Sequence, residues 1–573
     1  MLVQLLMKSN NNSLRIRLVL AGAIGIALVL ATKLYTVQIM QSNLYVERAN
    51  RQYERRSTPL FDRGSIFFTS KDGTKVSAAT IQEGVSLAIN PKDLSDAEEA
   101  YQQLKQFVAI DKDAFFEKAK KKEDPFEEIS KRLQGETGKQ ISGLKIPGVM
   151  VYRDAWRTYP AQSLAAHTIG LMGYQGDEFL GRYGLEKQYD LILVRNNKGQ
   201  FRNFFAEIFS GISTDSHGTS GDVVTTLEPS VQNHIETVLA DTKAKWESEE
   251  IGAIVMDPKT GEIVAMATLP NFNPNDVSKE KNPRVFSNPL VESAYEMGSI
   301  IKPLTMAVGI DTGSVTAGTT YNDKGTLTID KKKISNYDGK ARGVIPMQEI
   351  LSQSLNVGIA FIVQKTGNDA ITKYFKSFGF GELTGIDQPN ETKGLTRNLN
   401  SSRDIEHITM GYGQGISLSP IATVRALSIL ANGGQLITPH LVSSIEHEDG
   451  IEEKIEKKPA VQVLKKETTD TVTKMLVEVV DKALRHGEVK MEHYSIAAKT
   501  GTAQIADPVN GGYYTDRYLH SFFGYFPAYD PKYIVFMYQI YPKNVQYASE
   551  TLTNPFIDIA KFLINYYEIT PDR

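Results

Sequence analysis

Three short patterns in the second half of the chain bring together side chains that can perform acyl transfer. They are Ser299-Ile300-Ile301-Lys302, Ser354-Leu355-Asn356 and Lys499-Thr500-Gly501, in that order along the sequence. A serine hydroxyl attacks a carbonyl readily only when a base is nearby, and a neutral lysine three positions later is such a base. The patterns therefore predict a nucleophilic serine site, provided that the fold brings them together.

Local context has to choose among several copies of the first pattern. Ser-x-x-Lys also begins at Ser142 and at Ser278. Ser142 is followed closely by Pro147, and Ser278 lies among charged residues before Pro283, so both are predicted to be exposed loop serines. Ser299 instead precedes an apolar helical pattern, and the free N–H groups at a helix start can stabilise an oxyanion.

The Lys-Thr-Gly pattern also occurs three times, and context separates the copies. Lys259 falls in a predicted hairpin turn, and Lys365 falls near the predicted C-terminus of a helix that glycine caps. Lys499 lies in an extended, β-rich stretch, where Gly501 leaves room for another backbone to approach. A ligand chain could add to this strand as an extra strand.

The Ser-x-Asn pattern is the weakest of the three. It occurs at Ser9 and at Ser354, and Ser9 falls in the segment that we expect to be cytoplasmic. Ser354 and Asn356 stand at the start of an apolar helical segment, where either residue could simply cap the helix. A catalytic role is favoured only because the other two patterns occur in the same chain.

Strand and helix patterns around these residues predict one mixed domain. Strand patterns occur at 251–257 and 262–268, and again at 495–505, 521–527 and 533–541. Helical patterns occupy 299–312, 347–365, 368–378, 419–432, 468–484 and 554–567. Strands at both ends with helices between them predict an α/β domain of about 330 residues, in which an antiparallel sheet is closed by both termini of the domain.

The ordered patterns resemble the three motifs of penicillin-binding proteins and serine β-lactamases. Further segments resemble class B penicillin-binding proteins of the division-type branch: Arg63-Gly64-x-Ile66, Arg157-x-Tyr159-Pro160, Gly184-Leu185-Glu186, 225–232, the hairpin 257–261, Gly413-Gln414-Gly415 and 520–527. The chain departs from the family pattern at Met297, where proline is usual, and at Gln504, where glutamate is common. Neither departure removes a reacting group, but Met297 is expected to alter rigidity at the nucleophile.

The resemblance implies a transpeptidase fold with a five-stranded antiparallel sheet, and a D,D-transpeptidase that cross-links peptidoglycan. Ser299 would attack the carbonyl between two terminal D-Ala residues of a stem peptide, and β-lactams would acylate the same serine. Lys302, Ser354, Asn356 and Lys499 would be catalytic, while Thr500, Gly501 and Thr502 would bind substrate. The implied partners are stem peptides, β-lactam antibiotics, the lipid bilayer, a separate glycan polymerase and the cell-wall synthesis machinery, with neither a cofactor nor a metal. Which group acts as base in each step stays open.

Composition excludes several other classes. The chain has 573 residues, a net charge of −3 and 23% charged residues, which is ordinary for a globular protein and unlike a basic nucleic-acid binder. It has no cysteine, so thiolate nucleophiles, disulfide frameworks and cysteine-ligated metals are excluded.

The N-terminus predicts a membrane anchor. Residues 18–40 are mostly apolar, carry Lys33 as their single charged residue and would span about 34 Å as a helix, enough to cross a bilayer. Lys8, Arg15 and Arg17 precede this run, so the N-terminus is predicted to be cytoplasmic and the rest extracytoplasmic. A cleaved signal peptide is the alternative, but bulky residues follow the apolar core where small ones are needed.

The predicted organisation is a cytoplasmic tail at 1–17, a single-pass anchor at 18–40, a stalk at 41–243 resembling a dimerisation domain, and a transpeptidase domain at 244–573. A charge-rich stretch at 93–132 is interpreted as a solvated helix. Three alternatives stay open: a β-lactamase, which typically lacks such a stalk; a penicillin sensor, which should carry several spans; and a scaffold with a dead site. The Asn271–Asn275 stretch leans weakly toward a role in division.

Overall fold

The computed structural model describes residues 20–21, 25, 62–176, 178–195 and 220–573. The predicted cytoplasmic tail and nearly all of the predicted anchor lie outside these residues. Within the described part of the chain, no helix combines the length and the apolar character that crossing a bilayer requires.

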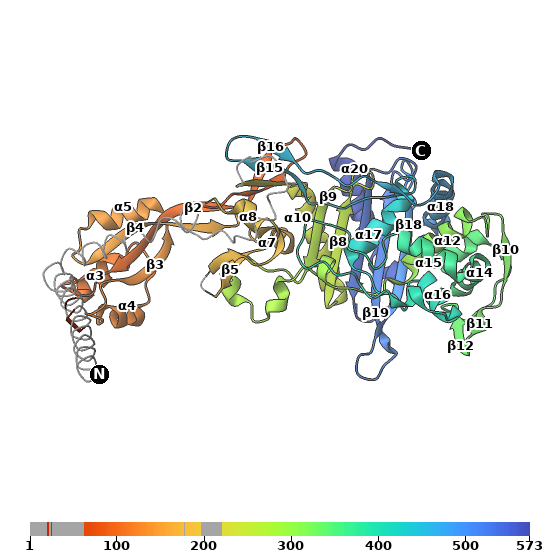
Figure 1. Ribbon diagram of the computed structural model, residues 1–573, viewed down its shortest axis with the longest axis horizontal. Helices are drawn as coiled ribbons and strands as arrows, with labels where there is room; N and C mark the ends of the chain where they lie inside the picture. The colour runs from red at the N-terminus through yellow and green to blue at the C-terminus, as the bar shows by residue number, and fades with distance from the viewer. Residues whose placement is uncertain (1–19, 22–24, 26–61, 177, 196–219) are drawn as a thin grey trace, which may run out of the picture. The chain divides into compact units, whose positions relative to one another are not determined.

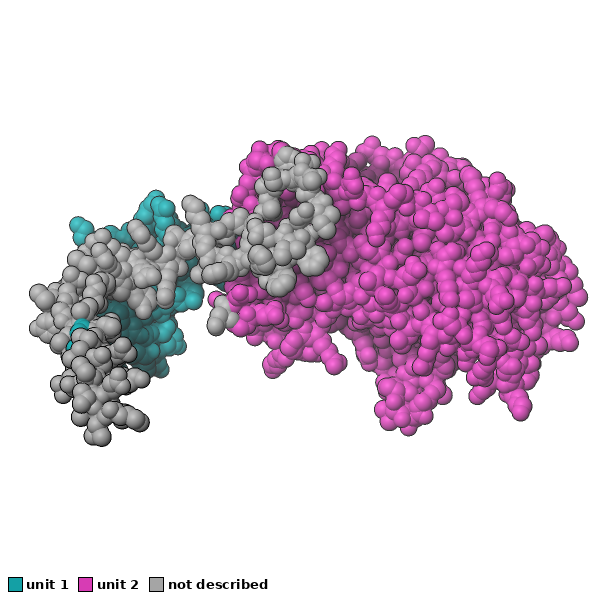
Figure 2. Space-filling view, viewed as in Figure 1, with its two compact units in different colours: residues 1–62, 81–156 teal, residues 63–80, 157–573 magenta. Residues whose placement is uncertain are grey.

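The chain divides into two compact units, coloured separately in Figure 2. One consists of residues 1–62 and 81–156, and the other of residues 63–80 and 157–573. This division follows contacts, so residues 157–243 of the predicted stalk group with the C-terminal part. The predicted functional boundaries at residues 41 and 244 stay predictions.

The large unit contains a five-stranded antiparallel sheet in the order β18-β19-β20-β8-β9 (Figure 1). Its strands are β8 (Glu250–Met256), β9 (Ile263–Leu269), β18 (Ala497–Ala506), β19 (Tyr513–Phe526) and β20 (Tyr533–Ile540). The first two and last three strands of the domain therefore pair, through β8 and β20. The predicted α/β domain closed by its two termini is confirmed, and β18 forms one edge of the sheet.

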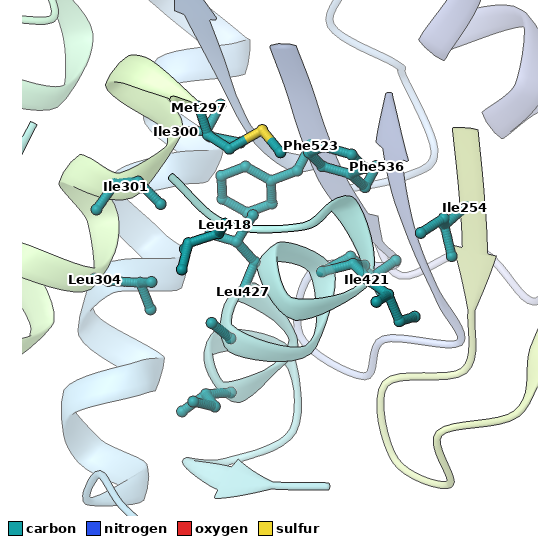
Figure 3. Packing of buried hydrophobic residues seen from close by; sticks show 14 of the residues in the cluster. Ile254, Met297, Ile300, Ile301, Leu304, Leu418, Ile421, Leu427, Phe523 and Phe536 are labelled. Carbon is teal, nitrogen blue, oxygen red and sulfur yellow. The ribbon is translucent and has the colours of Figure 1, made fainter. Parts of the chain in front are cut away.

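Alternating side chains of the strands enter two separate hydrophobic cores. Phe522, for example, packs with the helices α10 (Pro229–Trp246) and α20 (Thr553–Tyr566), which cover one face. Phe523 and Phe536 enter the larger core on the other face, where Figure 3 shows them with the surrounding side chains. This is the period-two pattern expected of a strand buried on both faces by helices.

Most of the remaining helices of the large unit pack in the larger core, while α19 (Ala548–Thr551) contacts β18 and β19. Those in the larger core are α11 (Pro289–Glu292), α12 (Lys302–Asp311), α13 (Met347–Ser352), α14 (Asn356–Thr366), α15 (Asn368–Ser377), α16 (Asp404–Gly411), α17 (Pro420–Ser428) and α18 (Lys466–Glu478). Small two-stranded sheets accompany them: β10 (Thr320–Asp323) with β13 (Gly343–Pro346), β11 (Thr326–Ile329) with β12 (Lys332–Ser335), and β14 (Gln435–Leu436) with β17 (Val461–Gln462).

The N-terminal elements belong to both units. In the large unit lie β1 (Ile66–Thr69), α6 (Ala166–Ile169), β5 (Met172–Gln175), β6 (Glu178–Gly181), α7 (Gly184–Gln188), α8 (Asp190–Leu193), β7 (Gly221–Thr225), β15 (Val442–His447) and β16 (Glu452–Lys454). The smaller unit holds α3 (Ala97–Leu104), α4 (Lys112–Ala119), β3 (Glu127–Leu133), α5 (Gly135–Gly143) and β4 (Val149–Thr158), whose last residues belong to the large unit. Strand β2 (Lys75–Ile89) passes from the large unit into the small one.

Two expected helices were wrong in detail. The charge-rich stretch 93–132 contains α3 and α4 but ends in β3, which pairs with β2. The stretch 347–365 is two helices, because the backbone of Ser354 has a φ of 55° and breaks the helical path. Both differences arise from tertiary pairing that local periodicity does not record.

Candidate active site

The turn that carries Ser299 is a short 3-10 helix, η4 (Gly298–Ile301), which leads directly into α12. The expectation of an α-helix starting at Ser299 is therefore off by one turn, since α12 begins at Lys302. Gly298 adopts a φ of +64°, a conformation that glycine accepts readily. The Ser299 side chain itself is partly exposed, as attack on an incoming substrate requires.

Lys302 reaches the second pattern. Its side chain is fully buried, and its Nζ donates to Asn356 Oδ1 at 2.8 Å, to the Ser354 carbonyl at 2.6 Å and to Ser354 Oγ at 3.2 Å. These three acceptors fix the amine at the first turn of α12. The structure therefore brings the first two patterns into direct contact, although more than fifty residues separate them.

The break between α13 and α14 presents these acceptors. A positive φ is uncommon for a residue other than glycine, and such strain is frequent at functional sites. Here the break at Ser354 allows both its carbonyl and its hydroxyl to face Lys302. Asn356, the first residue of α14, is oriented from its other side, because its Nδ2 donates to the Ser335 carbonyl at 2.9 Å.

The third pattern lies on the edge strand β18, which contacts η4. A Cβ placed on Gly298 would lie 3.0 Å from the Thr502 carbonyl oxygen, so the nucleophile turn sits directly against this strand. Lys499 is 3% exposed, and its Nζ donates to the Thr500 carbonyl at 2.9 Å. Thr502 Oγ1 accepts from the Ala548 N–H at 3.1 Å, which fixes its side chain.

Gly501 is required by a contact within the chain itself. A Cβ at this position would lie 2.7 Å from the Met297 carbonyl oxygen and closer still to Ser521 Oγ. Ser521 Oγ donates to the same Met297 carbonyl at 2.7 Å. The backbone that approaches Gly501 is therefore that of the nucleophile turn, a use of this glycine that its strand context alone did not reveal.

Met297 anchors the nucleophile turn in the core. Its side chain is 1% exposed and belongs to the same cluster as Ile300 and Phe523. Figure 3 shows the thioether of Met297 beside the ring of Phe523. A flexible, polarisable thioether fills such a space well.

Burial sets the charge state of both lysines. Burial, with Lys499 as the nearby cation, lowers the pKa of Lys302 well below its ordinary value. Burial also lowers the pKa of Lys499, to about 8. An amine with a lowered pKa is neutral at lower pH and can then accept the proton of a serine hydroxyl.

The other copies of the patterns lie where context placed them. Ser142 and Ser278 are exposed, and Lys259 follows Asp257 in the turn between β8 and β9. Lys365 lies in the last turn of α14, which Gly367 ends with a φ of 86°. Ser9 lies outside the described residues.

Several supporting residues have no signal in the local sequence. Ser335 and Ala548 each bond a site residue, yet they are distant from it along the chain. Glu296 accepts a hydrogen bond from Tyr513, which lies more than two hundred residues away. Only covariation among related sequences, or the fold itself, could have indicated these pairs.

Comparison with protein families decides the assignment. The penicillin-binding protein transpeptidase domain matches residues 251–561, more than half of the chain, and the penicillin-binding protein dimerisation domain matches residues 62–202. The chain belongs to the penicillin-binding protein transpeptidase family. It is a class B penicillin-binding protein, with a pedestal part and a transpeptidase part.

Curated relatives match most of the chain. Stage V sporulation protein D of Bacillus subtilis is 28% identical over 96% of this chain and 85% of its own length. The peptidoglycan D,D-transpeptidase FtsI of Buchnera aphidicola is 25% identical over 78% of this chain and 76% of its own.

Solved structures show the same fold. Penicillin-binding protein 2X from Streptococcus thermophilus has a TM-score of 0.72 at 20% identity, over 89% of this chain and 80% of that one. Penicillin-binding protein 3 from Mycobacterium tuberculosis, complexed with aztreonam, has a TM-score of 0.68 at 22% identity, over 89% of this chain and 97% of that one. The family match and the curated relatives, rather than these structures, identify the chain as a serine-type peptidoglycan D,D-transpeptidase of cell-wall synthesis.

Proposed function

We propose that Ser299 is the residue that becomes acylated and that Lys302 is the base that activates it. The observation that carries this proposal is the position of Lys302 Nζ, buried and held by Ser354 and Asn356 one turn after Ser299. Burial favours the neutral amine, which can take the serine proton, whereas a charged one cannot.

The reaction then proceeds in two balanced steps. Ser299 Oγ attacks the carbonyl between the two terminal D-Ala residues, and the C–N bond breaks while the departing amine of D-Ala receives a proton. Ser354 is placed to pass that proton on, because its hydroxyl lies 3.2 Å from Lys302 Nζ. An amine of a neighbouring stem peptide then attacks the ester, forming the cross-link and returning a proton to Ser299 Oγ.

Substrate recognition is assigned to the edge strand. The peptide adds along β18, where the charged form of Lys499 and the hydroxyls of Thr500 and Thr502 attract its terminal carboxylate. The N–H groups of Ser299 and Thr502 form the oxyanion hole. Contact between η4 and β18 supports this pairing.

Mass spectrometry of the intact protein after incubation with benzylpenicillin tests the assignment. We expect a stable adduct of one penicillin, located on the peptide that contains Ser299. An adduct on another serine would refute the assignment, rapid hydrolysis of the drug would indicate a β-lactamase, and no adduct would indicate a scaffold with a dead site.

For localisation, we propose a single-pass protein anchored by residues 18–40, with its catalytic domain outside the cytoplasm. The mostly apolar run, with Lys33 as its single charge, and the basic residues that precede it support this topology. In intact spheroplasts, external protease should degrade the catalytic domain and leave a cytoplasmic tag at residue 1 intact. A protected catalytic domain, or its release from the membrane, would contradict the proposed topology.

We propose further that the protein works at division beside a membrane-embedded glycan polymerase carried by a separate chain. The Asn271–Asn275 stretch that suggested division binds its own chain, since Asn275 both accepts from the Tyr159 N–H and donates to the Tyr159 carbonyl. Support therefore rests on the overall likeness to the division-type branch. Depletion should give filaments without septa, whereas rounded cells would indicate a role in elongation. Co-purification with a polymerase would support the partnership, and its absence after crosslinking in cells would contradict it.

A further inference from the structure

Glu296 lies three residues before Ser299, and its carboxylate joins two other parts of the domain. The hydroxyl of Tyr513 donates to it, at 2.9 Å to Oε2 and 3.1 Å to Oε1. The backbone N–H of Gly415 donates to Oε1 at 2.9 Å. The carboxylate is partly buried, and burial raises its pKa.

Both partners of Glu296 belong to segments that meet the reacting groups. The Gly415 loop bonds the nucleophile turn a second time, because the Gly298 N–H donates to the Gly413 carbonyl at 3.0 Å. Tyr513 begins β19 and pairs with Ala506, the last residue of β18. Glu296 therefore ties the nucleophile turn to the far end of the hairpin whose first strand carries Lys499 and Thr502.

This tie complements a contact at the middle of the same hairpin. There the Ser521 hydroxyl of β19 holds the Met297 carbonyl. Met297 is thus fixed against the middle of the β18–β19 pair. Its neighbour Glu296 is fixed against the end of the same hairpin. Together with the contacts of Gly298, these two attachments restrict the orientation of the turn relative to β18.

We propose that Glu296 and Tyr513 are positioning residues that hold the Ser299 N–H and the Thr502 N–H at the separation that stabilises the oxyanion. Oxyanion donors act only when they are preorganised around the developing charge, and a displacement of about 1 Å can cost about a hundredfold in rate. Neither side chain touches the substrate. Their contribution is to the geometry of the transition state.

The experiment measures acylation of the full-length protein in detergent across a range of penicillin concentrations. Tyr513→Phe removes one hydroxyl and leaves the ring. We expect the acylation rate constant at saturation to fall about tenfold, as for loss of a hydrogen bond to a charged group. The half-saturating concentration should change less than twofold, and the thermal midpoint should stay unchanged, because Tyr513 is partly exposed.

Matched variants separate positioning from general stability. Tyr514→Phe is the control, since its ring lies against the Arg517 guanidinium inside the same hairpin and loss of its hydroxyl should leave the rate unchanged. Glu296→Ala should lower the rate at least as far as Tyr513→Phe, while Glu296→Gln, which keeps an acceptor oxygen, should recover much of it. The double variant Glu296→Ala/Tyr513→Phe should match Glu296→Ala alone, because both remove one tie.

A wild-type rate in Tyr513→Phe, additive losses in the double variant, or losses that follow the thermal midpoint would overturn the inference. It rests on Ser299 as the acylated residue, so the modified peptide is identified in the same samples. An adduct elsewhere would refute the proposed nucleophile, whereas a Ser299 adduct with unchanged rates would refute only the positioning role.

Discussion

At the scale of single residues, the site depends on two buried amines that serve different ends. Lys302 is held by three oxygen acceptors and has to be neutral to accept a proton. Lys499 donates only to the Thr500 carbonyl among the bonds that the structure gives it, and its charge attracts a carboxylate. In the proposed mechanism, their different surroundings suit the two lysines to different tasks, as in other acid–base pairs.

The nucleophile itself provides the first prediction. Ser299→Ala should abolish covalent labelling by a fluorescent penicillin, because it removes the hydroxyl that is proposed to attack the drug. Labelling is read on a denaturing gel, with Ser278→Ala, an exposed serine followed by lysine at the same spacing, as the control. Labelling that survived in Ser299→Ala and vanished in Ser278→Ala would refute the assignment.

The pH dependence of acylation is the second prediction. The rate should rise with pH as Lys302 becomes neutral, with a midpoint well below 10.5, because its pKa is lowered. It should fall again near pH 8, where Lys499 loses its proton and with it the attraction for the substrate carboxylate. The measurement is the acylation rate constant between pH 5 and about 10.

Lys499→Ala tests the coupling between the two lysines. Removing this cation raises the pKa of Lys302, so the rising limb should move to higher pH while the falling limb disappears. Lys365→Ala, which alters another copy of Lys-Thr-Gly, should leave the profile unchanged. A profile that is flat from pH 6 to about 10 in the unaltered protein would argue against Lys302 as the base.

At the scale of elements, close contacts between backbones also hold the nucleophile turn, in addition to the side-chain bonds described above. Gly413 has a φ of +81°, and a Cβ there would lie 2.1 Å from the Gly298 carbonyl oxygen. The turn, its neighbouring loop and the edge strand can meet only because glycine stands at each point of approach.

Gly413→Ala should therefore displace the nucleophile turn. We expect acylation to fall about a hundredfold, because reacting groups misplaced by about 1 Å lose that much rate. Gly313→Ala is a matched control, since Gly313 has a φ of +75° but open space around it. This variant introduces backbone strain without a steric clash, so it shows how much of the loss strain alone would cause. Equal acylation losses in the two variants would mean that strain, not displacement, is responsible.

At the scale of the whole molecule, a buried ion cluster joins segments that precede the catalytic sheet. Glu186, fully buried, accepts from Arg63 at 2.8 Å, from Arg157 at 2.6 Å and from Tyr159 at 3.1 Å. Arg157 also donates to the Gly64 carbonyl at 2.7 Å. In the sequence, these residues stood out only as segments that resemble class B penicillin-binding proteins. The structure makes them a charged core within the large unit.

The last prediction concerns this cluster. Arg157→Ala leaves buried charge poorly compensated and should lower the free energy of unfolding by about 3 kcal/mol or more. Denaturant titration of the full-length protein measures it, with Lys466→Ala, from an exposed pair with Asp470, expected to cost less than about 1 kcal/mol.

The stabilisation that this cluster provides depends on pH. Burial raises the pKa of Glu186, but Arg157 and Arg63 outweigh burial and hold that pKa below its ordinary value. The stabilisation is therefore present above the ordinary carboxyl pKa and is lost as pH falls through the lowered one. Arg157→Ala should weaken this acid dependence, and an identical dependence in both proteins would contradict the proposed role of the cluster.

Local patterns determined a good part of this protein. Apolar periodicity placed four strands of the sheet to within about two residues and found only the second half of β19, and proline or charge next to the competing serines left Ser299 as the predicted nucleophile. Such features depend on neighbours a few residues away, which act through burial periodicity and turn chemistry. The sequence likewise indicated the family, since its motifs stand in the same order along the chain.

The tertiary structure alone decided how the motifs meet. The break at Ser354, the tie from Tyr513 to Glu296 and the contact of Gly501 with Met297 each join segments distant in sequence. Such contacts depend on the register of β18 with β19 and on the packing of α12 against α14, which no short window of residues specifies. Tertiary packing also decides that the Lys302 side chain is buried. That burial lowers the pKa of Lys302, on which the proposed chemistry depends.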